Sequence, residues 1–291
     1  MTLLISKVQH RNCEKGEFHD VENRTLEETL SLLLDFPWES ERHLADVELT
    51  CPSVTVEHPA GTFLKVGPYF SGKFSLYYLD CNGQVCFKVA STLVEASDCI
   101  RSFYKQEGIL PGFSKYGFVW KPSAHFQTNP FIYERPGTST NRFFKDARLT
   151  LFICLFFCLL MFFKPMPPSV SIFLVVMCVL IALAYSPLIY LYFNYRKFEE
   201  GRWLQLSRGS SSFILGLGKK MKMYRKSEIE SITVEGRRNR RSPSSVCKIY
   251  TIKFQNGDQI HIISLLIPED DFRNKFPDYI IQTVGKFFPA V

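Results

Sequence analysis

The chain has 291 residues, a formal net charge of +7 and nine cysteines. The cysteines include no Cys-x-x-Cys pair, and three of them fall in long apolar runs, which argues against a disulfide framework and against a zinc site. The charge is uneven: residues 1–148 carry 16 basic and 18 acidic side chains, whereas residues 196–291 carry 18 and 10. The basic excess therefore belongs to the C-terminal part, where anionic lipid and nucleic acid are the usual partners.

The N-terminal part has the pattern of a compact cytosolic α+β domain over residues 24–108, preceded by a loose N-terminus at 1–23. Met1–Ile5 is too short an apolar stretch for a secretory signal. Two capping boxes, Thr25–Glu28 and Thr92–Glu95, predict two helix starts. Alternating apolar residues between them predict about five strands, with a tight hairpin turn at Asn82-Gly83. No nucleophile–base–orienter spacing is visible, so we expect this domain to bind a partner and not to catalyse.

Residues 109–147 form an aromatic and proline-rich juxtamembrane segment. Aromatic side chains near a membrane often lie at the level of the headgroups. Packing of the same side chains onto the N-terminal domain is an equally good expectation, so both alternatives stay open.

Two apolar runs then predict a two-helix transmembrane hairpin over residues 148–194. The second run, Val170–Phe193, has no charged residue and is long enough to cross the hydrocarbon core. The first run, Leu149–Phe163, reaches across only if its flanking basic side chains extend to the interfaces. Pro187 should bend the second helix, with Ser186 helping to satisfy a freed backbone group.

Basic residues lie on both outer flanks of this hairpin, whereas the connecting loop carries only Lys164. Cytoplasmic flanks are enriched in Lys and Arg. We therefore expect a multi-pass protein of the bacterial inner (cytoplasmic) membrane with both termini in the cytoplasm. No ionisable residue interrupts the second run, which disfavours a channel or transporter.

Residues 202–291 read as a mainly β cytosolic domain with a short helix near 269–275 and a C-terminal helix at 278–288. Three features carry a resemblance to PH-like domains that follow a transmembrane hairpin in bacterial membrane proteins: the stretch Tyr224–Ile232, the Asn-Gly hairpin Tyr250–Ile260 and the terminal helix. The resemblance implies a small PH-like barrel and a binding or regulatory module. It implies no fixed ligand, because such folds host lipid, peptide and protein ligands alike.

Two basic clusters are the candidate anionic-lipid or phosphate sites of this domain. They comprise Arg237, Arg238, Arg240 and Arg241 in one loop, and Lys219, Lys220 and Lys222 beside one predicted strand. Guanidinium groups offer forked donors that suit phosphate. A solvated cytosolic loop is the alternative interpretation. Nucleic acid is disfavoured because no aromatic stacking platform accompanies the arginines.

Together these patterns predict a non-enzymatic, membrane-tethered binding or regulatory module for a protein partner or for anionic lipid of the inner leaflet. An immunity protein that neutralises a membrane-targeting bacterial toxin is the alternative function. The sequence predicts no catalytic residue, no metal ligand and no cofactor.

Overall fold

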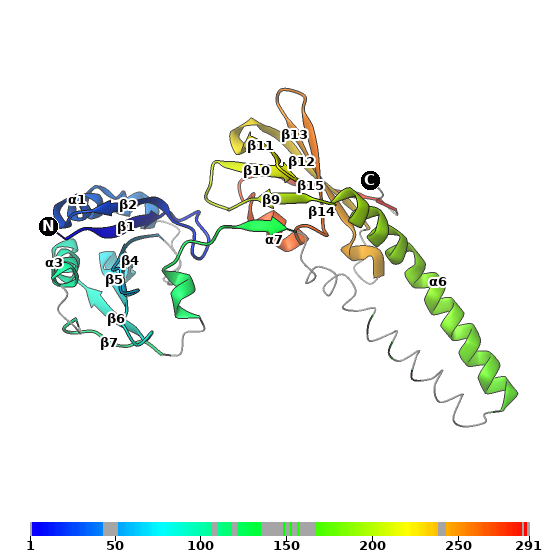
Figure 1. Cartoon of the computed structure of the whole chain (residues 1–291), viewed down its shortest axis with the longest axis horizontal. Helices are drawn as coiled ribbons and strands as arrows, with labels where there is room; N and C mark the ends of the chain where they lie inside the picture. Colours follow the sequence, from blue (N-terminus) through cyan, green and yellow to red (C-terminus); the bar gives the residue numbers. More distant parts are fainter. Residues whose placement is uncertain are drawn as a thin grey trace. The chain divides into compact units, whose positions relative to one another are not determined.

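The computed structural model describes residues 2–42, 52–105, 110–117, 121–134, 148, 152, 156, 167–237, 243–286 and 288–289. These residues form two compact units (Figure 1). Unit 1 comprises residues 1–130 together with the short segment 207–210, and unit 2 comprises residues 131–206 and 211–291.

Unit 1 is built on one seven-stranded sheet with the strand order β2-β1-β3-β4-β5-β6-β7. Every neighbouring pair is antiparallel. The strands are β1 (Leu4–Gln9), β2 (His19–Arg24), β3 (Ser53–Glu57), β4 (Phe63–Pro68), β5 (Phe74–Leu79), β6 (Val85–Ala90) and β7 (Ser114–Lys115). The expected Asn82-Gly83 turn joins β5 to β6, with Gly83 at a φ of +72° and the Asp80 carboxylate accepting from the Asn82 and Gln84 backbone N–H groups.

The expectation of a loose N-terminus over residues 1–23 is wrong, because β1 lies between β2 and β3. The sequence did not predict this strand because polar residues interrupt its apolar ones. Lys7 and Gln9 are buried on the second face of the sheet, where Lys7 donates to Glu57 at 2.9 Å and Gln9 accepts from Lys65 at 2.7 Å. Ser6 is buried on the face of Leu4 and Val8, where its hydroxyl accepts from Arg24 at 3.0 Å. A strand with partnered polar groups buried among its apolar residues lacks the clear alternation that marks a strand in a sequence.

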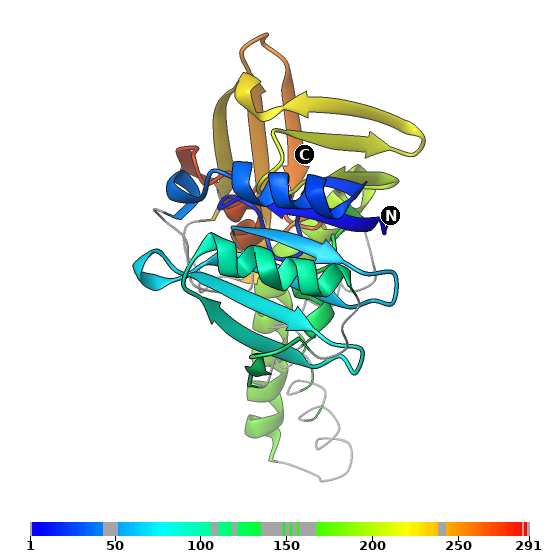
Figure 2. The same ribbon diagram turned by 90° about the vertical axis from the view of Figure 1, so that its left-hand side faces the viewer.

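Three helices complete unit 1: α1 (Leu26–Asp35), α2 (Trp38–Arg42) and α3 (Leu93–Tyr104). Thr25 and Glu28 form the expected reciprocal capping box. Thr92 likewise accepts from the Glu95 backbone, although the Glu95 carboxylate accepts from Ser91 and not from Thr92. Figure 2 shows α1 and α3 side by side on one face of the sheet, and their apolar side chains share one core with β1, β3, β4 and β5.

The described part of the aromatic segment packs onto unit 1. Phe126 is fully buried and stacks on Phe63 with ring centroids 5.4 Å apart, behind the short 3-10 helix η2 (Pro122–His125). Tyr116 lies edge-on to Tyr77 at 5.3 Å. Of the two alternatives, packing onto the N-terminal domain holds for these side chains. Another 3-10 turn, η1 (Phe70–Gly72), lies between β4 and β5.

Unit 2 consists of two four-stranded sheets with the orders β11-β10-β9-β8 and β14-β13-β12-β15. The strands are β8 (Ile132–Glu134), β9 (Arg202–Gln205), β10 (Ser212–Leu217), β11 (Lys220–Arg225), β12 (Ile229–Gly236), β13 (Lys248–Phe254), β14 (Gln259–Ile263) and β15 (Ile281–Gly285). Side chains of both sheets share one apolar core, which α7 (Glu269–Asn274) closes through Phe272, stacked on Tyr250 at 4.2 Å. Two 3-10 turns, η3 (Lys226–Glu228) and η4 (Pro243–Val246), flank β12 and β13.

The predicted C-terminal helix at 278–288 is wrong. Residues 281–285 form β15, which pairs in parallel with β12 from Ile232↔Ile281 to Gly236↔Gly285. The segment is rich in β-branched residues, and this pairing satisfies its backbone with a strand 50 residues earlier. The short helix predicted near 269–275 is confirmed as α7, and so is the Asn256-Gly257 turn, where Gly257 has a φ of +84°.

One described helix, α6 (Pro168–Phe198), is long and apolar enough to cross a membrane. The first predicted span, 149–163, lies outside the described residues except for Phe152 and Phe156, which are helical and exposed. The two-helix hairpin is therefore described for its second helix alone. In α6 the Ser186 hydroxyl donates to the Leu183 carbonyl at 2.9 Å, which is the acceptor that Pro187 leaves free, as expected.

Candidate functional site

The helix α6 passes from one environment to another along its length. In its first part, apolar side chains are exposed on different faces, with 65% exposure for Ile172, 63% for Phe173 and 62% for Leu183. In its last turns, Leu188, Leu191, Tyr192 and Tyr195 are buried against Ile249 and Ile263 of β13 and β14. The Tyr195 hydroxyl also donates to the Pro289 carbonyl at 2.7 Å. The helix is therefore exposed and apolar at one end and part of the core of unit 2 at the other.

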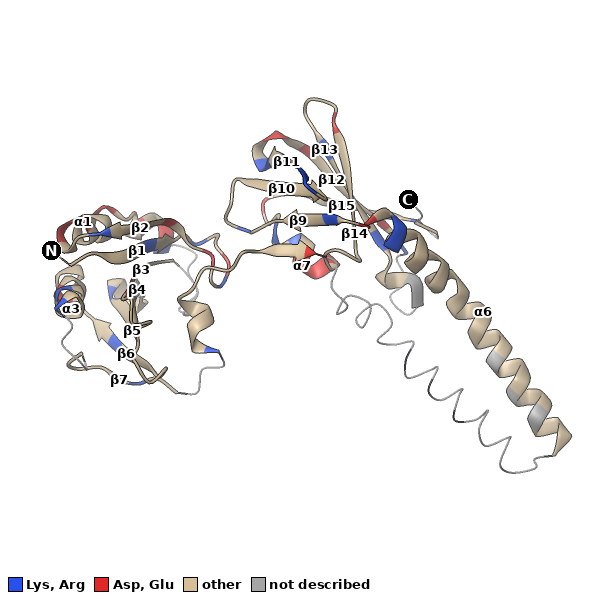
Figure 3. Ribbon diagram, in the orientation of Figure 1, with Lys and Arg blue, Asp and Glu red and all other residues tan. Residues whose placement is uncertain are grey.

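The charges of α6 lie only at its C-terminal end. No residue from Pro168 to Tyr195 is charged, and the last turn carries Arg196 and Lys197 (Figure 3). Cations at a helix C-terminus are favoured by the negative end of the helix dipole.

The arginine loop follows β12, and its η4 flank lies beside α6. Arg237 is half-buried directly after β12, and its carbonyl accepts from the Lys248 ammonium at 3.0 Å. On the far side of the loop, η4 contacts α6, and Cys247 is buried with Leu188 and Tyr192. Arg238, Arg240 and Arg241 lie outside the described residues. The η4 end of the loop is thus fixed next to the last turns of α6, and the Arg237 end is fixed to Lys248 of β13.

The lysine cluster lies on the sheet of β8 to β11, beside the turn between β13 and β14 of the other sheet. Lys219, Lys220 and Lys222 are exposed on the hairpin between β10 and β11. Lys222 forms an ion pair at 2.9 Å with Asp258, which belongs to the turn between β13 and β14. Arg237 lies beyond the other end of β13, whose seven residues span about 20 Å. The structure therefore does not bring the two predicted clusters together.

A shallow hollow of about 430 Å³ lies beside the lysine cluster. Its lining includes Phe198, Arg202, Leu215, Leu217, Met221 and Lys222. Leu217 and Met221 are largely exposed, and β11 is the edge strand of its sheet. The hollow combines apolar walls with basic groups, which is the lining that an anionic amphiphile requires.

Arg202 and Glu199 lie close together in the structure, a pairing that the sequence did not predict. The Arg202 guanidinium donates to the His261 carbonyl at 3.0 Å and lies over the Phe198 ring at 4.4 Å. Glu199 is fully buried directly after α6, with Oε2 3.7 Å from the Arg202 Nε. Burial raises the pKa of Glu199 to about 7, against the lowering effects of Arg202 and the Ile263 backbone. Nothing in the sequence marks Glu199, because it stands in a charged stretch that reads as solvated.

Comparison with known proteins gives one match. The PH domain family matches residues 133–275, a range that begins at β8, includes α6 and ends after α7. No curated protein and no solved structure matches the chain. The family match begins before the apolar runs. The structure agrees, because β8 precedes these runs in the chain and pairs with β9, which follows them. It confirms the PH domain predicted in the C-terminal part of this chain.

Proposed function

We propose that this protein is a non-enzymatic, membrane-anchored binding module. In this proposal α6 and the first apolar run cross the inner membrane, both units lie in the cytoplasm, and the arginine loop of the PH domain binds anionic lipid of the inner leaflet. The change of environment along α6 is the observation that carries the proposal.

An apolar helix that exposes its side chains on all faces has no stable place in water, whereas hydrocarbon accepts it. The 20 residues from Pro168 to Pro187 reach about 30 Å, which is the thickness of a hydrocarbon core. The next turns enter the core of unit 2 without a linker. A span of this kind would hold the domain directly at the membrane surface, as a flexible tether would not.

The arginine loop is the better-placed candidate for lipid because its η4 flank contacts α6 and Cys247 packs with Leu188 and Tyr192. The lysine cluster lies beside Phe198, at the end of α6 farther from its exposed apolar part. Four arginines there would meet the headgroups of the leaflet from which α6 emerges. Each basic residue near an anionic surface contributes on the order of 1 kcal/mol. The lysine cluster lies at the other end of β13 and is partly neutralised by Asp258, which makes it the weaker candidate. No observation on the described residues favours the immunity function over this one.

Membrane integration and topology test the first half of the proposal. The full chain should stay in the membrane fraction after an alkaline carbonate wash. A phosphatase that is active only in the periplasm should be inactive when fused at Val291, and a cytoplasmic fluorescent reporter should be active there. Release by carbonate would contradict the anchor, and an active phosphatase would reverse the orientation.

Lipid binding by the arginine loop tests the second half. Native mass spectrometry of the full chain, released from detergent, should show more phosphatidylglycerol than phosphatidylcholine bound. Replacing the four loop arginines by glutamine should reduce this preference at least about tenfold. The matched control replaces Lys219, Lys220 and Lys222 by glutamine and should leave the preference intact. If the lipid preference were lost only in the lysine variant, the site would be the hollow beside β11. If both variants kept the preference, a protein partner would be favoured.

A further inference from the structure

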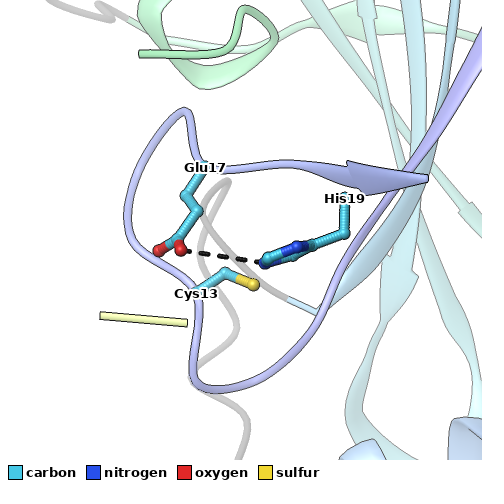
Figure 4. A group of neighbouring side chains, drawn as sticks. All are labelled: Cys13, Glu17 and His19. Atoms are coloured by element: carbon cyan, nitrogen blue, oxygen red, sulfur yellow. Dashed lines mark ion pairs between the residues drawn. The ribbon is translucent and has the colours of Figure 1, made fainter. Parts of the chain in front are cut away.

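A group of metal-ligating side chains lies in unit 1, in the loop between β1 and β2. Cys13, Glu17 and His19 place one sulfur, one oxygen and one nitrogen atom within 4.8 Å of one another. Figure 4 shows the three side chains converging, with the Glu17 Oε1 to His19 Nε2 separation of 3.7 Å drawn as a dashed line. Cys13 and Glu17 are buried, whereas His19 is partly exposed.

The separations suit a small tetrahedral ion. Zinc bonds of about 2.0 Å to nitrogen and oxygen and about 2.3 Å to sulfur place a nitrogen–oxygen pair about 3.3 Å apart and sulfur about 3.5 Å from either. The 3.7 Å between Glu17 and His19 is within about half an ångström of this separation. All three ligand atoms lie within 4.8 Å of one another, so small side-chain shifts would close the site on the ion. A thiolate, an imidazole and a carboxylate together match zinc, whereas magnesium and calcium prefer oxygen ligands alone.

Backbone hydrogen bonds orient two of the three ligands, Cys13 and Glu17, as is usual for metal ligands. The Cys13 sulfur accepts from the His10 backbone N–H at 3.2 Å. Glu17 Oε2 accepts from the Glu14 backbone N–H at 2.8 Å, and the Gly209 N–H donates to both Glu17 oxygens at 3.0 Å. Oε1 is the oxygen nearest to His19. Hydrogen bonds of this kind fix a ligating carboxylate and orient it toward the metal.

We propose that Cys13, Glu17 and His19 bind one zinc ion, with water completing the tetrahedron. Binding would deprotonate the Cys13 thiol and release the proton to solvent. Because the Glu17 carboxylate also accepts from Gly209, the ion would fasten segment 207–210 to the β1–β2 loop. The sequence predicted no metal site, since the ligands are three different residue types at a spacing without a paired cysteine.

The test uses the full chain in detergent, first stripped with a chelator and then dialysed against zinc or cobalt. Plasma mass spectrometry should find about one zinc per chain. The cobalt form should show the thiolate-to-metal charge-transfer absorption and the intense visible bands of a tetrahedral site. Cys13→Ser and His19→Asn should each weaken zinc binding at least tenfold, measured by competition with a chromophoric chelator. The matched controls Cys81→Ser and His58→Asn, in the same unit, should bind as the wild type does.

Circular dichroism of the metal-free variants separates loss of the site from loss of the fold. If Cys13→Ser misfolds, His19→Asn carries the test, because its side chain is partly exposed. Zinc binding that is equal in wild type, Cys13→Ser and His19→Asn would overturn the proposal, as would a cobalt form without thiolate absorption. Loss of binding in the Cys81→Ser or His58→Asn control would assign the metal to other residues and overturn it as well.

Discussion

Glu199 is a buried carboxyl between the end of α6 and the start of β9. Neither of its oxygens receives a hydrogen bond of ordinary geometry from the described residues, and its nearest cation is Arg202 at 3.7 Å. A carboxyl whose pKa is raised in the folded protein gives its full stabilisation at low pH. The junction between helix and domain should therefore respond to pH.

The direction of this response follows from the two pKa values. Unfolded Glu199 loses its proton near 4.5 and folded Glu199 near 7, so stability falls as the pH rises from about 4.5 to about 7. The loss is on the order of 3 kcal/mol. Thermal unfolding of the full chain in detergent should show Glu199→Gln gaining stability over the wild type at pH 8 and not at pH 4. The control Glu200→Gln, at the exposed neighbour, should keep the wild-type pH dependence.

Gly209 approaches the side chains of the β1–β2 loop more closely than another residue could. A Cβ atom at Gly209 would lie 2.8 Å from the Cys13 sulfur and 2.9 Å from the Glu17 Oε1. Gly209→Ala should therefore lower the stability of unit 1 by about 1–3 kcal/mol. The control Gly117→Ala has open space around its Cβ position and should be close to neutral. Equal unfolding midpoints for the two variants would mean that segment 207–210 does not pack against this loop in solution.

At the scale of elements, α6 has two halves with different roles. Leu191 is fully buried against the sheet of β13 and β14, whereas Phe193, two residues later, is 60% exposed. Leu191→Ala should cost about 2–5 kcal/mol of unfolding free energy for unit 2, by loss of burial and by the cavity that it leaves. Phe193→Ala should cost far less in detergent. A similar small effect of both substitutions would mean that the end of α6 is a tether and not part of the core.

Local signals predicted the elements that local contacts stabilise. The capping box at Thr25, the turns at Asn82-Gly83 and Asn256-Gly257 and the apolar run of α6 each depend on neighbours in the chain. The strands β1 and β15 were missed because distant strands define them. Polar residues of β1 find buried partners across the sheet, and β15 pairs with a strand far back in the chain.

The candidate site was likewise predicted only in part from the sequence. Composition was enough to find the basic residues, because charge is visible in a sequence. Their placement depends on strand register, which sets Lys222 beside Asp258 and Arg237 at the other end of β13. Glu199 and the lining of the hollow were missed, since burial of a charged residue and a gap between strands arise only from tertiary packing.

At the scale of the molecule, unit 1 is complete only with a segment from the second half of the chain. Backbone N–H groups of Arg208 and Gly209 donate to the Glu14 and Glu17 carboxylates at 2.6 and 3.0 Å. Residues 1–130 alone contain all seven strands and three helices of the unit, and should unfold cooperatively. A fragment that begins at residue 24 would lack β1 and β2 and should not fold.

Joining residues 205–211 to the 1–130 fragment through a Gly/Ser linker should raise its stability. Hydrogen bonds to charged groups contribute about 1.5–3 kcal/mol each, less the entropy of ordering the segment. We expect a net gain of about 1–3 kcal/mol in urea unfolding, without a change in m value. The matched control carries Gly209→Ala in the joined segment and should show little gain. Equal midpoints with and without the segment would contradict its assignment to unit 1.

The discontinuity of unit 1 also sets an order of events during synthesis. Residues 1–130 leave the ribosome first, but segment 207–210 follows only after both apolar runs have been translated. At about 5–20 residues per second, the 80 residues between Pro130 and Ser210 take roughly 4–16 s. For that time the carboxylates of Glu14 and Glu17 lack their last backbone donors. The N-terminal unit therefore cannot reach its final form before both apolar runs have been made, which makes it a late-maturing part of the protein although it is translated first.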